Sequence, residues 1–154
     1  MEKALVGIVM GSKSDREVME EAIKVLERFE IPHEILTSSA HRDPDRTRAY
    51  AKGAKKKGIK VLIAGAGYAA HLPGALAGET TLPVIGVPLA SSPLRGIDSL
   101  FSMVQMPSGI PVATMGIGKS GAENAALLAA EILALEDEKL AMALEKYRNG
   151  LKEK

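Results

Sequence analysis

Two histidines and one arginine are the side chains best suited to proton transfer and anion binding. His41 and Arg42 are neighbours, and His71 follows in a later segment. An imidazole titrates near neutral pH and can donate or accept a proton, whereas a guanidinium stays charged and forms paired hydrogen bonds with a phosphate or carboxylate. These residue types are typical of a site that binds a small anion and moves a proton, but they leave the reaction undetermined.

Each of these residues also has a purely structural interpretation. Arg42 could pair with Asp43 or Asp45, and His41 could serve only to cap its loop. His71 precedes a Leu-Pro pair and could cap a short helix instead of binding a substrate. The spacing of the residues leaves both interpretations open.

A polar loop at residues 11–15 is a further candidate for ligand binding. Gly11 permits a close approach of the backbone, and Ser12 and Asp15 are residue types that cap helices. The free N–H groups at the start of a helix can hold a phosphate or a polyol. Because the spacing is neither that of a P-loop nor Gly-x-Gly-x-x-Gly, a capped helix start and a ligand site both remain open.

Composition excludes several kinds of site and partner. The 154 residues contain no cysteine, and the 3 histidines include no His-x-x-x-His pair, so we expect no metal site. The net charge is +1, and the lysines of residues 52–60 lack interleaved aromatics, so we expect no nucleic-acid partner. The apolar run at residues 4–10 is too short for a membrane span and unlike a secretory signal, which predicts a cytoplasmic protein without a membrane partner.

The elements that must position these loops are short apolar strands that alternate with helices. Apolar runs predict strands at residues 4–10, 33–38, 59–64, 83–87 and 111–115. Helical periodicity predicts helices at residues 15–29, 44–57, 71–79, 97–105, 122–135 and 137–149. This alternation predicts an α/β fold, one domain over residues 1–154, with a parallel sheet covered on both faces. Ligands of such folds bind outside the carboxyl ends of the strands, where the candidate loops fall.

Small residues dominate the expected core. Only 3 tyrosines and 2 phenylalanines stand against 15 glycines, and the helix at residues 122–135 is apolar nearly all round. Such a helix is buried either in a core or between subunits. Since a chain of this size would gain from burying more surface, we expect an oligomer.

The candidate loops belong to a longer series of motifs. In chain order these are Gly11-Ser-Lys-Ser-Asp15, Ser39-Ala-His-Arg-x-Pro-Asp45, Ala64-Gly-x-Gly-x-Ala-Ala-His-Leu-Pro-Gly74, Gly86-Val-Pro88, Leu94-x-Gly-x-Asp-Ser-Leu100, Val104-Gln-Met-Pro-x-Gly-x-Pro-Val-Ala-Thr114 and Asn124-Ala-Ala-Leu-Leu-Ala-Ala130. Over about residues 4–150 the chain resembles the PurE family of purine biosynthesis, the N5-carboxyaminoimidazole ribonucleotide (N5-CAIR) mutases. The resemblance implies a flavodoxin-like three-layer α/β/α subunit, a homo-octamer, and catalysis without a metal, ATP or an organic cofactor.

The resemblance also implies a reaction and roles for individual residues. A carboxylate would move from the exocyclic nitrogen of N5-CAIR to C4 of the imidazole, which gives carboxyaminoimidazole ribonucleotide (CAIR). His41 would be the general acid–base, Arg42 would bind the phosphate, and Ser39 would lie beside the base. The loop of Ser12 and Asp15 would hold the 5′-phosphate end and the ribose hydroxyls.

The loop of Ala70, His71 and Leu72 would close the pocket, exclude water and retain CO2. Within this pattern, Tyr68 stands where many relatives have glycine, and Asp43 stands where threonine is usual. These departures remove no proposed catalytic group, but they place a bulky phenol at the pocket loop and a negative charge beside the phosphate ligand.

Two alternatives remain at this stage. A sister class of the family carboxylates aminoimidazole ribonucleotide directly with CO2, and the Ala-Ala-His-Leu-Pro-Gly segment resembles the mutase class instead. The chain could also be a non-catalytic phosphosugar-binding module, against which the pairing of His41 with Arg42 argues. A transient contact with the synthetase that forms N5-CAIR is a further hypothesis about partners.

Overall fold

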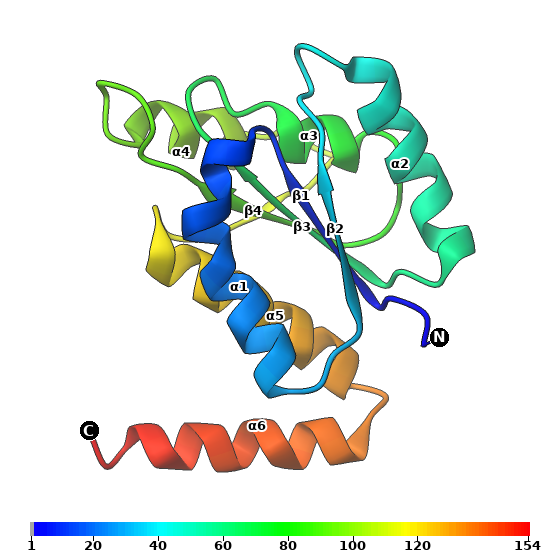
Figure 1. The fold of residues 1–154 in the computed structure, drawn as a ribbon, viewed down its shortest axis with the longest axis vertical. Coiled ribbons are helices and arrows are strands. Elements are labelled where there is room, and N and C mark those ends of the chain that lie inside the picture. The colour runs from blue at the N-terminus through cyan, green and yellow to red at the C-terminus, as the bar shows by residue number, and fades with distance from the viewer. Residues whose placement is uncertain (1) are drawn as a thin grey trace.

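A parallel sheet forms the centre of the protein in the computed structural model, which describes residues 2–154. In this part of the chain five strands pair in the order β2-β1-β3-β4-β5, all of them parallel (Figure 1). The strands are β1 (Val6–Met10), β2 (His33–Thr37), β3 (Val61–Ala66), β4 (Val84–Pro88) and β5 (Ala113–Thr114). This is the flavodoxin-like strand order, so the predicted fold class is confirmed.

Helices cover both faces of the sheet. They are the short 3-10 helix η1 (Lys13–Asp15) and the α-helices α1 (Arg16–Arg28), α2 (Pro44–Lys57), α3 (Leu72–Ala77), α4 (Ile97–Val104), α5 (Lys119–Ala134) and α6 (Glu138–Leu151). One core cluster joins the sheet to α1 and α5, and a second joins it to α2, α3 and α4. The result is the three-layer arrangement visible in Figure 1.

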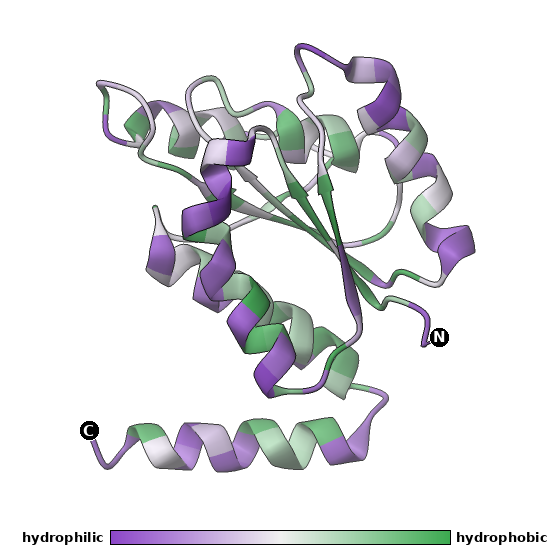
Figure 2. Cartoon of the chain, in the orientation of Figure 1, coloured by the Kyte–Doolittle hydropathy of each residue, from purple (hydrophilic) through white to green (hydrophobic). Residues whose placement is uncertain are grey.

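The central strands are apolar at nearly every position because both of their faces are buried. Successive side chains of a strand point to opposite faces. Ile8 of β1 therefore packs in the cluster with α1 and α5, while Val9 packs in the cluster with α2, α3 and α4. Figure 2 shows much of the central strands in the green of hydrophobic residues. A strand exposed on one face would alternate with polar residues instead.

Small residues let α1 and α5 lie close to the sheet. Ala122, Ala125 and Ala129 of α5 are fully buried in this layer. At Gly65 of β3 an added Cβ would lie 2.9 Å from Cγ of Met19, so the glycine makes room for that side chain. The helix predicted at residues 122–135 is thus buried on one side in the core of its own chain.

Every predicted strand differs from the structure at one end or both, and the third and fifth differ most. The third was expected at residues 59–64, but β3 begins at Val61, because Gly58 ends α2 with a φ of +101° and the Ile59 N–H still donates to the carbonyl oxygen of Ala54. The fifth was expected at residues 111–115, but only Ala113–Thr114 pairs with β4. Pro111 has no N–H to donate, which shortens this edge strand.

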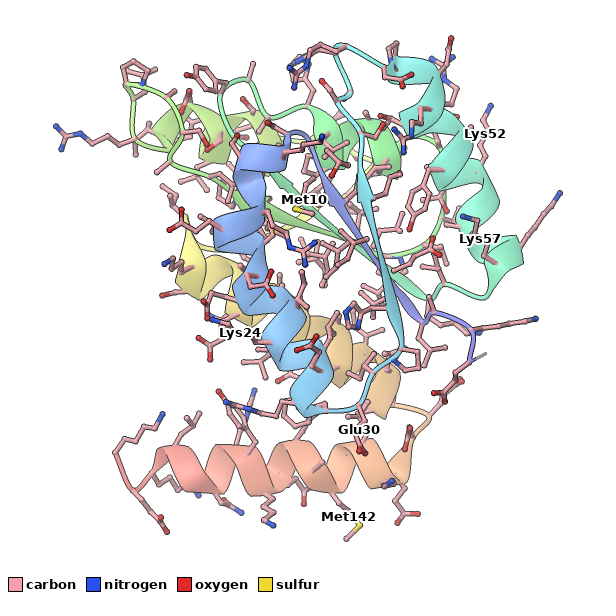
Figure 3. The ribbon with its side chains drawn as sticks, viewed as in Figure 1. Met10, Lys24, Glu30, Lys52, Lys57 and Met142 are labelled. Carbon is pink, nitrogen blue, oxygen red and sulfur yellow. The ribbon has the colours of Figure 1, made fainter. Side chains whose placement is uncertain are left out.

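The last two helices are longer than predicted. α5 begins at Lys119 instead of residue 122, and α6 ends at Leu151 instead of residue 149. Asp137 caps α6 by accepting a hydrogen bond from the Leu140 N–H at 3.0 Å. This helix crosses the outside of the layer formed by α1 and α5, and its outer side carries Met142 into solvent (Figures 1 and 3).

None of the helices within residues 2–154 combines the length and the hydropathy that crossing a membrane would require.

Candidate active site

Three loops at the carboxyl ends of β1, β2 and β3 surround one cavity of about 490 Å³. Parallel strands place their carboxyl ends at the same edge of the sheet, and β2, β1 and β3 are neighbours. Every residue that the sequence predicted for the site lines this cavity: Ser12, Asp15, Ser39, His41, Arg42, Ala70, His71 and Leu72. The topology therefore brings together the loops that the sequence analysis selected separately.

The loop after β1 is a capped helix start that also faces the cavity. Ser12 accepts a hydrogen bond from the Ser14 N–H at 3.3 Å, and Asp15 accepts one from the Ser12 N–H at 2.9 Å. These reciprocal bonds form a capping box at η1. The structural interpretation of this loop is thus confirmed, and it does not compete with ligand binding because the same residues line the cavity.

Asp15 is buried beneath this loop, with 6% of its surface exposed. Burial raises the pKa of the Asp15 carboxyl above its usual range, since a carboxylate loses solvation there. The hydrogen bond from Ser12 and the charge of Arg42 act in the opposite direction and only partly offset this rise in pKa.

We expect the Asp15→Asn variant to gain stability relative to the wild type as the pH rises. A group with a raised folded-state pKa contributes most below its unfolded-state pKa, and this contribution is lost as the pH rises through the folded-state pKa. The asparagine side chain can still accept the Ser12 N–H but carries no buried charge. Urea unfolding at pH 4 and pH 7 measures the difference. The same change at Asp45, whose side chain is 95% exposed, serves as the control for the loss of one carboxylate at the surface.

The loop after β2 is ordered by hydrogen bonds, and its three candidate residues, Ser39, His41 and Arg42, line the cavity. Asp43 caps α2 by accepting the Arg46 N–H at 3.2 Å, and Pro44 occupies the first turn, where its missing N–H costs nothing. The carboxylate of Asp43 is thus used at the start of α2. The hydroxyl of Ser38, which is buried, forms a further hydrogen bond with the hydroxyl of Thr47, at 2.8 Å between the two oxygens.

Arg42 does not pair with its neighbouring aspartates, so that interpretation of the sequence is wrong. In the described part of the chain Asp45 lies 3.8 Å from Arg48, and Asp43 caps α2. The Arg42 guanidinium instead donates through Nη2 to the carbonyl oxygen of Gly11 at 3.2 Å. This bond holds the cation across the mouth of the loop after β1 and leaves further N–H groups for an anion.

His41 and His71 form a direct pair across the cavity. His41 Nε2 lies 2.7 Å from His71 Nδ1, and the ring centroids are 4.6 Å apart at an interplanar angle of 62°. His71 stands at the N-cap position of α3, but its side chain makes no capping bond. The capping interpretation of His71 is therefore wrong, and the ring is available to His41.

A hydrogen bond between these two nitrogens requires that one of them carries a proton. Each neutral imidazole has one donor and one acceptor nitrogen, so a neutral pair keeps the bridge with a single shared hydrogen. One additional proton can be placed on an outer nitrogen with the bridge intact. A second additional proton would make both facing nitrogens donors and would break the hydrogen bond between the two rings. The pair is thus able to exist in two protonation states without rearranging.

The loop after β3 presents mainly backbone to the cavity. At Gly67 an added Cβ would lie 2.6 Å from the hydroxyl oxygen of Ser91, so a larger residue would not fit. Ala70 and Leu72 are buried behind this loop, whereas Tyr68 is 59% exposed and has a φ of +55°.

Ser91 is a lining residue that the sequence analysis did not select. It follows β4, which pairs with β3, so its loop ends at the same edge of the sheet as the other loops. The rule that ligands bind at the carboxyl ends of parallel strands could have identified the loop of Ser91 as part of the site.

No three side chains of the types His, Asp or Glu within residues 2–154 lie close enough together to hold a metal ion. The cavity instead offers an imidazole pair, a guanidinium, serine hydroxyls and backbone groups. These features are those of an α/β enzyme whose site, at the carboxyl edge of a parallel sheet, is able to hold an anionic ligand and transfer protons.

Comparison with known proteins assigns the chain to one family of enzymes. The family model described as AIR carboxylase matches residues 5–154, and the chain belongs to this family. A relative from Bacillus subtilis (strain 168), named N5-carboxyaminoimidazole ribonucleotide mutase, is 57% identical over 97% of this chain and 92% of its own length. A relative of the same name from Escherichia coli (strain K12) is 54% identical over 96% of this chain and 87% of its own.

A solved structure supports the same assignment. The crystal structure of Treponema denticola PurE superimposes with a TM-score of 0.88 at 32% identity, over 98% of this chain and 93% of that one. The resemblance inferred from the motifs is therefore confirmed.

Proposed function

We propose that this chain is an N5-CAIR mutase, an isomerase that converts N5-CAIR into CAIR in purine biosynthesis. Its near-complete alignment with relatives that carry this name supports the reaction. The observation that carries the mechanism is the His41–His71 pair beside Arg42 in one cavity. Residues 1–154 would act as one catalytic domain, and the site residues below are part of the same proposal.

His41 transfers the proton in both halves of the reaction. In its protonated form it protonates the carbamate nitrogen of N5-CAIR as the N–C bond breaks, which yields CO2 and aminoimidazole ribonucleotide. C4 of the imidazole then attacks CO2, and neutral His41 removes the C4 proton. The ring becomes aromatic again, the product is CAIR, and His41 returns to its protonated form.

The pair with His71 suits this cycle. Because the bridge engages His41 Nε2, a proton added to the pair can reside on His41 Nδ1, where it is available for donation. Loss of that proton leaves the neutral pair with the bridge intact. His71 thereby keeps the His41 ring in one orientation while its protonation state changes, which is how a second group commonly supports a catalytic histidine.

The remaining residues hold the substrate. Arg42 pairs with the 5′-phosphate through the N–H groups that its bond to Gly11 leaves free. Ser12 and Asp15 bind at the phosphate end and the ribose hydroxyls, and Ser39 lies beside the base.

The loop of Ala70, His71 and Leu72 closes the pocket and keeps CO2 beside C4. Positioning of this kind is worth roughly 7–11 kcal/mol of the activation barrier.

Turnover of freshly prepared N5-CAIR, with EDTA present and ATP absent, tests this function. Formation of CAIR from N5-CAIR alone is the expected result. Formation only from aminoimidazole ribonucleotide with CO2 would assign the chain to the direct carboxylases. Binding of both nucleotides without turnover would indicate a phosphosugar-binding module.

A homo-octamer in the cytoplasm is part of the proposal. α4 and the turn before it expose a strip of apolar side chains, Leu94, Ile97, Phe101 and Val104, each at least 47% exposed in the single chain. Apolar strips of this kind mark interaction surfaces. Light scattering should give about eight times the 16.3 kDa of one chain, whereas a stable monomer would contradict the assembly.

The synthetase that forms N5-CAIR would be a transient partner.

A further inference from the structure

Tyr68 adopts a backbone conformation that a tyrosine rarely takes. Among residues 2–154, the residues other than glycine with a positive φ are Glu30 at +54°, Tyr68 at +55° and Arg95 at +54°. Of these, Tyr68 is the one that lines the cavity. Bulky side chains are disfavoured in this left-handed region because Cβ crowds the following carbonyl oxygen.

Packing within the chain does not account for this strain. The Tyr68 side chain is 59% exposed, so it buries little apolar surface that could offset the cost. Its hydroxyl makes no hydrogen bond to any described residue. Strained backbone conformations cluster at ligand-binding sites, and Tyr68 lines the candidate site.

The cavity supplies the polar groups that bind a sugar phosphate, but it has few side chains that could stack on a flat base. Serine hydroxyls, Arg42 and the two histidines account for its polar lining, and the Tyr68 ring is the aromatic side chain that lines it beside them. An aromatic ring can stack against any planar base. The Tyr68 ring, which lines the cavity, is therefore available to stack on the base of a nucleotide.

We propose that Tyr68 is a specificity-determining residue whose ring contacts the imidazole of the bound nucleotide. The proposal rests on the proposed function, because it takes the aminoimidazole ribonucleotides as the ligands of the cavity. In this role Tyr68 discriminates a nucleotide with a flat base from a bare sugar phosphate. It takes no part in proton transfer.

The test uses the full-length wild type and the variants Tyr68→Gly, Tyr68→Phe and Glu30→Gly. Calorimetry measures the dissociation constants of aminoimidazole ribonucleotide and of ribose 5-phosphate, and a thermal scan measures Tm. For Tyr68→Gly we expect affinity for the nucleotide to fall about tenfold, with affinity for ribose 5-phosphate unchanged. We also expect Tm to rise by about 2–6 °C, because glycine accepts the left-handed backbone.

Two matched variants separate the ring from the backbone. Tyr68→Phe keeps the ring and should bind both ligands as the wild type does. Glu30 has nearly the same φ, +54°, but it follows α1 and is not among the residues that line the cavity (Figure 3). Glu30→Gly should therefore raise Tm while leaving both dissociation constants unchanged.

Several outcomes would overturn the proposal. If Tyr68→Gly binds the nucleotide as tightly as the wild type does, the Tyr68 ring does not contribute a contact to the base. A change in oligomeric mass of Tyr68→Gly with unchanged affinities would make Tyr68 an interface residue instead. Failure of the wild type itself to bind aminoimidazole ribonucleotide would count against the proposed function, and this result is distinct from a failure confined to the variant.

Discussion

The His41→Asn variant should lower kcat for N5-CAIR by about 10²–10⁴-fold, with KM within a few-fold of the wild type. Asparagine keeps a polar group on the same backbone but cannot carry a proton between the carbamate nitrogen and C4. In the proposed function Arg42 binds the phosphate, and His41 makes no hydrogen bond to Arg42 in the described residues. The loss therefore falls on the chemical step, and steady-state kinetics with fresh N5-CAIR measures it.

His33→Asn is the matched control for this result. His33 lies at the opposite end of β2 from the site, and its ring bonds the carbonyl oxygen of Ile31 at 2.9 Å. The same chemical change there should leave kcat unchanged. A His41→Asn variant with full turnover would show that another group moves the proton, and His71 would be the next residue to test because it lies 2.7 Å away.

Gly121→Ala should lower the free energy of unfolding by about 3 kcal/mol. An added Cβ would overlap the carbonyl oxygen of Gly116 and would lie 2.7 Å from its carbonyl carbon. These are backbone atoms, so no side chain can rotate away. Ala122 and Ala125 on the same helix are fully buried, which prevents α5 from retreating without loss of packing. Urea unfolding monitored by circular dichroism measures the change.

Gly53→Ala is the matched control for the helix itself. Gly53 lies inside α2, and an added Cβ would meet nothing within 4 Å. Alanine should therefore raise the free energy of unfolding by about 0.5–1 kcal/mol through helix propensity. A Gly121→Ala variant as stable as the wild type would mean that the segment before α5 can shift to accept the methyl group.

Local patterns were enough to predict the order of strands and helices. An apolar run of a few residues between turns can bury both faces only in a covered sheet, and helical periodicity identifies the covering helices. Pro44 and Gly58 mark the two ends of α2 by their own backbone preferences. These signals depend on only a few neighbouring residues, so they can be interpreted without knowledge of the rest of the chain.

The sequence also predicted that the candidate site residues would lie together. Once the strands are parallel, their following loops share one edge of the sheet, and His41, Arg42 and His71 lie in two of those loops. The family motifs supported the same residues, and the comparison with known proteins confirmed the family.

The partners of the site residues were decided only by the tertiary structure. Arg42 bonds the Gly11 carbonyl rather than the aspartates next to it in sequence, and His71 bonds His41 rather than its own helix. Each of these hydrogen bonds joins residues about thirty positions apart, and its geometry depends on how β1, β2 and β3 pair and twist. Residue types and spacing limit which bonds a side chain can make, whereas the packed fold determines which of them lies within reach.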